Sequence, residues 1–149
     1  MHPHERDFPE ARGGCQCGAV RFTISAGPAE PGLCHCRMCQ RATGNAFAPL
    51  YKVPNGRVSW QGRPAEWASS NLAWRGFCPT CGTPLYYRDA EGIEIMAGCL
   101  TLDFPFAPLE NEGVQSRVPW LAGIGALPDR ATDPALAAAV LSHQAPEVP

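Results

Sequence analysis

Apolar and polar residues alternate along short stretches of this chain, a pattern that predicts β-strands with one buried face. In residues 19–25, Val20, Phe22 and Ile24 share one face of such a strand. Pro49 interrupts a second stretch, and because proline lacks a backbone donor we expect an edge strand or a bend there. The strands predicted in this way span residues 19–25, 46–53, 57–60, 66–68, 72–77, 84–88 and 93–98.

Helical signals are confined to two short stretches. Residues 36–42 are predicted to form a helix that stops at Gly44, because glycine readily takes the left-handed conformation that ends helices. Asp133 is suited to cap a last helix that carries Pro134 in its first turn and runs to about Ser142. Together with the strands, these signals predict a mainly β fold with two short helices.

The composition describes a single folded domain. The chain has 149 residues, of which 45% are hydrophobic and 17% charged, and this balance excludes a disordered acidic or basic tail. A net charge of −2 gives no positive field, so we expect no nucleic-acid partner. Lys52 is the only lysine beside eleven arginines, and arginine is well suited to bind an acidic small molecule.

The sequence indicates a cytoplasmic protein without a membrane partner. Residues 1–12 lack the apolar core of a signal peptide, and no run of 18 apolar residues occurs. In the cytosol thiols stay reduced, which bears directly on the cysteines.

Eight cysteines carry most of the chemical information. Seven of them fall in three tight clusters, whereas Cys99 stands alone. Cysteines two positions apart pair poorly as disulfides but can converge on one metal ion, and thiolates favour zinc. We therefore predict metal binding. The clustered residues are Cys15, Cys17, Cys34, Cys36, Cys39, Cys78 and Cys81.

The strongest single motif is Cys78-Pro-Thr-Cys81-Gly82. Its turn directs two sulfurs toward one point, and the glycine can take a positive φ that lets backbone N–H groups face the thiolates. A closed zinc site completed by another cysteine pair is the favoured interpretation. A thioredoxin-like redox pair is the alternative, but no βαβ pattern surrounds the motif.

Seven clustered thiols divide into four and three. Four thiolates close a tetrahedral structural site, whereas three leave one position for water or substrate. The compact cluster at residues 34–39 is the natural open site. The alternative is a second closed site completed by Cys99 or His35. Against Cys99, the alternation over residues 93–99 places its side chain on the apolar face of a strand.

An open site of this kind has a defined chemistry. Three thiolates leave Zn²⁺ with a net charge of −1, so the centre would hold a further thiolate and deliver it to an aldehyde carbonyl. Arg37 and Arg41 lie four residues apart, on one face of the predicted helix, where they would bind a carboxylate of the thiol substrate. Solvated surface side chains are the alternative. For His35 we favour an outward-pointing spacer over a proton shuttle.

Four segments of the chain form an ordered series of motifs. The first is Gly-Gly-Cys-Gln-Cys-Gly-Ala-Val-Arg-Phe at 13–22, and the second is Cys-His-Cys-Arg-Met-Cys-Gln-Arg-Ala-Thr-Gly at 34–44. The third is Phe-Cys-Pro-Thr-Cys-Gly-Thr-Pro-Leu at 77–85, and Ser-Arg-Val-Pro-Trp closes the series at 116–120. Together they resemble the motifs of the glutathione-dependent formaldehyde-activating enzyme family, which shares its domain with centromere protein V.

The resemblance implies several coiled antiparallel sheets built around two zinc ions per chain. The family's reaction joins formaldehyde to glutathione as S-hydroxymethylglutathione, or reverses that step, which is a carbon–sulfur lyase activity. We divide the chain into a flexible N-terminus (1–12), the zinc-binding formaldehyde-activating-type domain (13–122) and a C-terminal extension with a short helix (123–149). The implied ligands are Cys15, Cys17, Cys78 and Cys81 for a structural zinc, and Cys34, Cys36 and Cys39 for a catalytic zinc.

One position departs from the family pattern. Members often carry a histidine nine residues before the closing tryptophan, and here Asn111 stands there, followed by Glu112 and Gly113. This departure puts glutathione in question more than zinc. Two other functions stay open at this point: a non-catalytic binding module in which both zincs are structural, and a thiol redox enzyme that uses Cys99.

Overall fold

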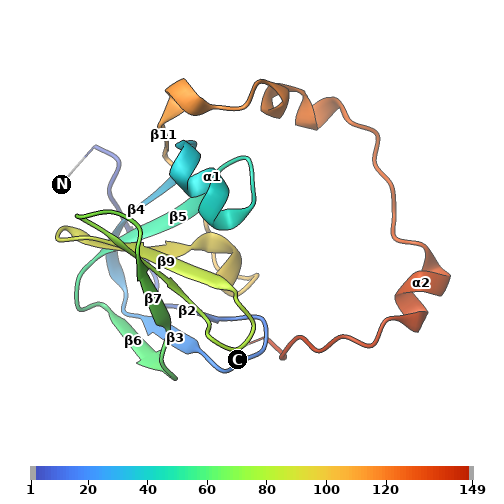
Figure 1. Cartoon of the computed structure of the whole chain (residues 1–149), viewed down its shortest axis with the longest axis horizontal. Coiled ribbons are helices and arrows are strands. Elements are labelled where there is room, and N and C mark those ends of the chain that lie inside the picture. The colour runs from blue at the N-terminus through green and yellow to red at the C-terminus, as the bar shows by residue number, and fades with distance from the viewer. Residues whose placement is uncertain (1–2, 148–149) are drawn as a thin grey trace.

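The computed structural model describes residues 3–147, which fold mainly into β-strands (Figure 1). The larger sheet contains β1 (Arg6–Phe8), β4 (Gly27–Cys34), β5 (Ala48–Pro54), β7 (Ala65–Ala68), β8 (Trp74–Phe77), β9 (Pro84–Arg88), β10 (Gly92–Met96) and β11 (Glu110–Glu112). The smaller sheet contains β2 (Ala11–Gly14), β3 (Arg21–Ile24) and β6 (Val58–Gln61). The predicted mainly β class is confirmed.

The order of strands in the larger sheet is β1-β4-β5-β10-β9-β8-β7, and β11 joins β4 outside that path. The pairs along this path are antiparallel, whereas β11 runs parallel to β4. The smaller sheet is antiparallel in the order β2-β3-β6. The hairpin of β9 and β10 lies where the alternating pattern predicts it.

The hydrophobic core combines side chains of both sheets. Phe22 and Ile24 on β3 are buried, as the alternation predicts, and they belong to the same cluster as Tyr51, Leu85 and Ile95 of the larger sheet. Apolar faces of both sheets are thereby removed from water, which supplies most of the driving force for folding. The cluster also includes Cys15 and Cys78, so two of the first four candidate ligands are part of the core.

Strand β5 corrects the expectation attached to Pro49. It lies inside the larger sheet, between β4 and β10, and is not an edge strand. Pro49 faces Leu33 on β4, but the ladder with β10 ends one residue away, at the pair Leu50–Met96. Pro49 therefore needs pairing on one side only, which makes a proline acceptable in a central strand.

Both predicted helices are present. Helix α1 (Arg37–Thr43) begins after Cys36, whose sulfur accepts a hydrogen bond from the Cys39 amide, and it ends at Gly44 with φ 64°. Helix α2 (Pro134–Ala139) starts at the predicted cap, Asp133, but stops before Ser142. Short 3-10 turns form at η1 (Ala97–Cys99), η2 (Val114–Ser116) and η3 (Pro119–Ala126).

The two ends of the chain were not anticipated in detail. The segment predicted to be a flexible N-terminus contributes β1 and the start of β2. The C-terminal part runs as a wide arc away from the sheets and returns to them (Figure 1). It is fastened there by the Ala145 amide, which donates to the Gln16 carbonyl at 2.8 Å. Among residues 3–147 no helix is long and apolar enough to cross a membrane. The cytoplasmic location stays a prediction.

Candidate functional site

The first cysteine cluster joins the two sheets. Cys15 and Cys17 lie between β2 and β3, whereas Cys78 and Cys81 lie between β8 and β9. Their four sulfurs lie within 4.8 Å of one another. Two of the distances, 3.6 Å for Cys15–Cys17 and 3.8 Å for Cys17–Cys78, match the separation of roughly 3.8 Å that thiolates have in a tetrahedral Zn²⁺ site with bonds of about 2.3 Å. This cluster fits a closed four-thiolate site.

Local hydrogen bonds fix the turns that carry these sulfurs. The Val20 amide donates to the Cys15 sulfur at 3.3 Å, and Gly82 takes a positive φ of 77° as its amide donates to the Cys78 carbonyl. The Thr83 hydroxyl accepts from the Gln16 amide and lies 3.1 Å from the Cys81 sulfur, so it links the two turns. Burial opposes the shift, but hydrogen bonds from Thr83 and Cys17 outweigh it and lower the pKa of Cys81 to about 6. A lowered pKa favours the thiolate that a metal needs.

The second cluster is local to the end of β4 and the start of α1. The sulfurs of Cys34, Cys36 and Cys39 also lie within 4.8 Å of one another. Among residues 3–147, no fourth cysteine, histidine or carboxylate joins this group. Neither His35 nor Cys99, the candidate eighth ligands, is part of it. The structure therefore brings the seven clustered cysteines together as four and three.

Arg75 on β8 is a neighbour of the second cluster that the sequence did not reveal. Its Nη2 atom donates to the Cys39 sulfur at 3.4 Å, and its guanidinium lies 5.2 Å from the ring centre of Tyr87. Arg75 is only 8% exposed. The neighbouring Cys34 thiol and Arg75 together lower the pKa of Cys39 to about 5, although burial opposes them. A lowered pKa favours the thiolate form of Cys39, next to the buried Arg75 guanidinium.

His35 is buried, at 1% exposure, so the expectation of an outward-pointing spacer is wrong. The side chain turns inward because strand β11 and Phe47 cover it: the Nε2 atom lies 2.8 Å from Asn111 Oδ1, and the Phe47 ring is 5.6 Å away. The Oδ1 atom can only accept, so Nε2 is the donor. Asn111, the position that departs from the family pattern, therefore supports the peptide between two candidate ligands.

Strand β11 and the glycine that follows it lie directly against the backbone of the second cluster. The His35 amide donates to the Glu112 carbonyl at 2.8 Å. Gly113 has φ 61°, and a Cβ atom there would lie 2.8 Å from the Cys36 amide nitrogen, so a larger residue does not fit. The chain passes so close to Cys36 at position 113 that only a glycine fits there.

Arg37 and Arg41 are exposed on α1, one turn apart. Arg37 Nη1 donates to Gln40 Oε1 at 3.1 Å. Gln40 is buried and donates in turn to the carbonyls of His35 and Ser116. The two arginines are accessible to an anionic ligand, and their binding role stays a prediction.

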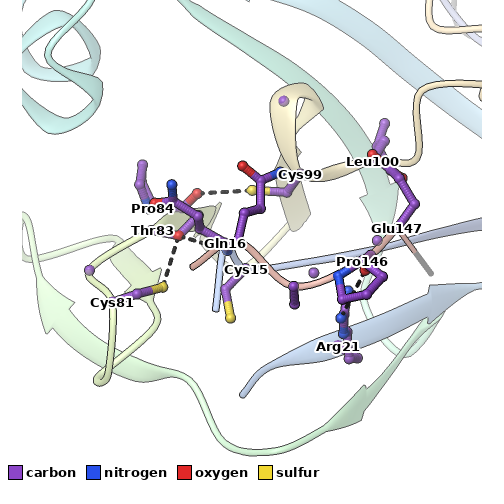
Figure 2. Close-up of a pocket in the computed structure, with 16 residues that line it drawn as sticks. Cys15, Gln16, Arg21, Cys81, Thr83, Pro84, Cys99, Leu100, Pro146 and Glu147 are labelled. Atoms are coloured by element: carbon purple, nitrogen blue, oxygen red, sulfur yellow. Dashed lines mark hydrogen bonds between the residues drawn. The ribbon is translucent and has the colours of Figure 1, made fainter. Parts of the chain in front are cut away.

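Cys99 belongs to neither cluster. The predicted strand ends earlier, at Met96, and Cys99 lies in turn η1 with its sulfur 3.3 Å from the Pro84 carbonyl (Figure 2). Burial raises the pKa of Cys99 to about 12. A thiol in this state is a poor nucleophile, which disfavours redox chemistry at this residue.

A cavity of about 480 Å³ lies beside the first cluster (Figure 2). Cys15, Cys81 and Cys99 line it on one side, and the C-terminal residues line it on the other. Arg21 Nη2 donates to the Pro146 carbonyl at 3.2 Å and holds this end of the chain in place. The cavity thus contacts the chain's own terminus and lies next to the four-sulfur cluster.

Comparisons with known proteins agree with this architecture. An uncharacterized lyase of Schizosaccharomyces pombe (strain 972) is 31% identical over 85 residues, which cover 57% of this chain and 62% of that protein. The match therefore spans less than two thirds of this relative. A solved Rhodobacter sphaeroides protein, a structural-genomics target, has a TM-score of 0.54 at 18% identity and covers 67% of this chain and 98% of its own. That likeness concerns the fold alone.

The sequence profile of the glutathione-dependent formaldehyde-activating enzyme matches residues 10–112. The matched range contains both cysteine clusters and ends at β11. It covers more than half of the chain, and the chain therefore belongs to the glutathione-dependent formaldehyde-activating enzyme family.

Proposed function

We propose that this protein is an enzyme of the lyase type that forms or breaks a carbon–sulfur bond between a small thiol and an aldehyde. Membership of the family and the relative named a lyase support the lyase class. The observation that carries the proposal is the second cluster, in which three sulfurs converge beside Arg75 without a fourth ligand among residues 3–147. Glutathione is the proposed type of thiol, and formaldehyde is the family's aldehyde.

Each cysteine cluster would bind one zinc ion. The spacing of the sulfurs and the preference of Zn²⁺ for thiolates support this assignment. The four-sulfur cluster would be structural and the three-sulfur cluster catalytic. Cys34, Cys36 and Cys39 would hold the catalytic zinc ion, which would favour the deprotonated form of a thiol at its open position.

The protein's own groups would orient the reactants. Arg75 supplies positive charge next to Cys39 in a buried setting, where it offsets part of the negative charge of the thiolates. Arg37 and Arg41 would contact a carboxylate of the thiol from the exposed side of α1. His35 and Asn111 would hold the peptide between Cys34 and Cys36 in place.

The alternative, a binding module with two structural zincs, requires a protein ligand at the fourth position of the second cluster. The separation of Cys99 and His35 from that cluster is the observation that favours an enzyme.

Calorimetric titration with glutathione tests the proposal, with S-methylglutathione as the control because it lacks the free thiol. We expect the free thiol to bind and the methylated one not to bind. Cys36→Ser should abolish the thiol-dependent binding. The rate of S-hydroxymethylglutathione formation should exceed the rate in buffer alone. Equal binding of both compounds would refute coordination through sulfur, and binding without acceleration would make the protein a carrier rather than an enzyme.

A further inference from the structure

A second cavity, of about 450 Å³, is lined by Arg75, and it shares Gly82 and Pro84 with the lining of the cavity in Figure 2. Its lining is mostly apolar and aromatic and comes from α1, β7, β8, β9 and β10. Cavities of roughly 300–1,000 Å³ with such linings are typical of small-molecule sites. Its lining includes Trp67, Arg75, Tyr86 and Met96.

The cavity borders the second cysteine cluster. Arg75 lines it and also donates to the Cys39 sulfur. Met96 lines it and packs in the same apolar cluster as Cys39. Ala42 also lines the cavity, and it lies on α1 one turn after Cys39. A ligand in this cavity would therefore lie next to the proposed reaction centre, whereas the cavity of Figure 2 lies beside the four-sulfur cluster.

The walls of the cavity are fixed in place. The Tyr86 ring lies over Gly76, where an added Cβ atom would be 2.1 Å from the ring. The Tyr86 hydroxyl donates to Glu66 Oε1 at 2.9 Å, and Arg88 Nη2 donates to Glu66 Oε2 at 2.8 Å. The Glu66 carboxylate is thereby neutralised within the wall. Tyr86 and its neighbours present a preformed surface that needs little ordering when a ligand binds.

Arg75, which lines the cavity, carries one buried hydrogen-bond donor that the described residues do not satisfy. Its Nη1 atom is buried and has no hydrogen-bond partner among residues 3–147. A buried N–H group without an acceptor is unfavourable, so an oxygen supplied by a ligand would be stabilising. Because Nη1 and Nη2 belong to one guanidinium, an oxygen held at Nη1 lies close to the cysteine cluster.

Resting on the proposed function, we propose that this cavity binds the carbon side chain of an aromatic or bulky apolar aldehyde, with the aldehyde oxygen accepting from Arg75 Nη1. The single carbon of formaldehyde would leave the cavity nearly empty, since an apolar cavity of about 150 Å³ already holds benzene. In the reaction, the thiol sulfur forms a bond to the aldehyde carbon, and the π pair of the C=O bond moves to oxygen. That oxygen takes up the proton that the thiol lost, so no redox partner is needed.

Fluorine NMR tests the cavity without any thiol. The probe is 4-fluorobenzoate, whose carboxylate replaces the aldehyde oxygen, and 4-fluorobenzylammonium is the control of opposite charge. We expect saturable binding of the benzoate only. Trp67→Ala should weaken it about tenfold, because Trp67 is a cavity wall. Trp120→Ala is the matched control, since Trp120 is 62% exposed and Trp67 64%, and it should change nothing.

A kinetic measurement ties the cavity to the reaction. With glutathione as the thiol, Trp67→Ala should lower the ratio of kcat/KM for benzaldehyde to that for formaldehyde about tenfold. Arg75→Lys adds a second variant that keeps the charge but loses the second donor, and it should weaken benzoate binding. Absence of benzoate binding, equal binding of the ammonium probe, or binding that Trp67→Ala leaves intact would overturn the inference. If the probe behaves as expected but no aldehyde reacts, the cavity assignment stands and the lyase proposal fails.

Discussion

Replacing Cys78 by serine should unfold the domain, whereas replacing Cys36 by serine should leave it folded. Cys78 is fully buried in the main core. With Cys81 it connects β8 and β9 to a pair of cysteines 61 or more positions earlier in the chain. Binding of a metal by four thiolates contributes about 10–16 kcal/mol, which is comparable to the whole stability of a domain, about 5–15 kcal/mol. Loss of one of these ligands is therefore sufficient to unfold the protein.

At Cys36 the same substitution acts on a different kind of site. Its cluster spans only six residues, so a metal there closes no long loop. The Cys36 sulfur also caps α1, and serine is a good capping residue, so the helix start survives. Thermal unfolding followed by circular dichroism, with zinc supplied, should give a melting temperature for the Cys36 variant at least ~10 °C above that of any folded Cys78 variant. Equal losses in the two variants would refute the separation into a stabilising and a reactive site.

The remaining predictions concern single side chains. Cys99→Ala should keep two zinc ions per chain in metal analysis and cost only about 1 kcal/mol, because Cys99 packs without joining a cluster; loss of one zinc would instead make it a ligand. Burial and the nearby Glu112 carboxylate raise the pKa of Glu94 to about 7. The folded state therefore binds more protons than the unfolded state, and the free energy of unfolding should fall as the pH rises from about 4.5 to about 7. Glu94→Gln should therefore stabilise the protein at pH 8 by up to about 3 kcal/mol and have little effect at pH 4, and a pH-independent effect in chemical denaturation would contradict this reasoning. Asn111→Ala leaves Nε2 of buried His35 without its acceptor and should cost about 1–3 kcal/mol, whereas Asn111→Asp should cost less because an acceptor remains; equal losses in denaturant titrations would argue against the hydrogen bond.

The sequence was sufficient to predict those strands and helices whose own residues carry a clear pattern, such as alternation or a terminating glycine. Alternation located β3, and Gly44 located the end of α1. Strand β4 was missed because Gly27, Pro28, Pro31 and Gly32 lower its intrinsic preference for a strand. Its strand conformation is imposed by pairing with β1 and β5 on its two sides and with β11 near its end. Such pairing joins residues far apart in the chain and leaves no local pattern.

The cysteine clusters could be predicted because their ligands are adjacent in sequence, but the environment of the second cluster could not. Arg75 precedes the motif that begins with Cys78, and nothing in Trp-Arg-Gly-Phe indicates that its side chain reaches Cys39. The inward orientation of His35 likewise depends on β11, a three-residue strand that no local sequence pattern indicates.

The candidate metal ligands of the second cluster and the residues around the proposed substrate cavity come from different parts of the chain. The candidate ligands Cys34, Cys36 and Cys39 lie close together in the sequence, so their spacing can be shared by proteins with different substrates. The groups that would meet a substrate come from distant strands, with Arg75 and Trp67 on β8 and β7. These strands lie at one end of the larger sheet, where Trp67 is exposed and can be exchanged without disturbing the core. Specificity for the aldehyde can therefore change at β7 while the cysteine motifs, and the carbon–sulfur chemistry proposed for them, stay the same.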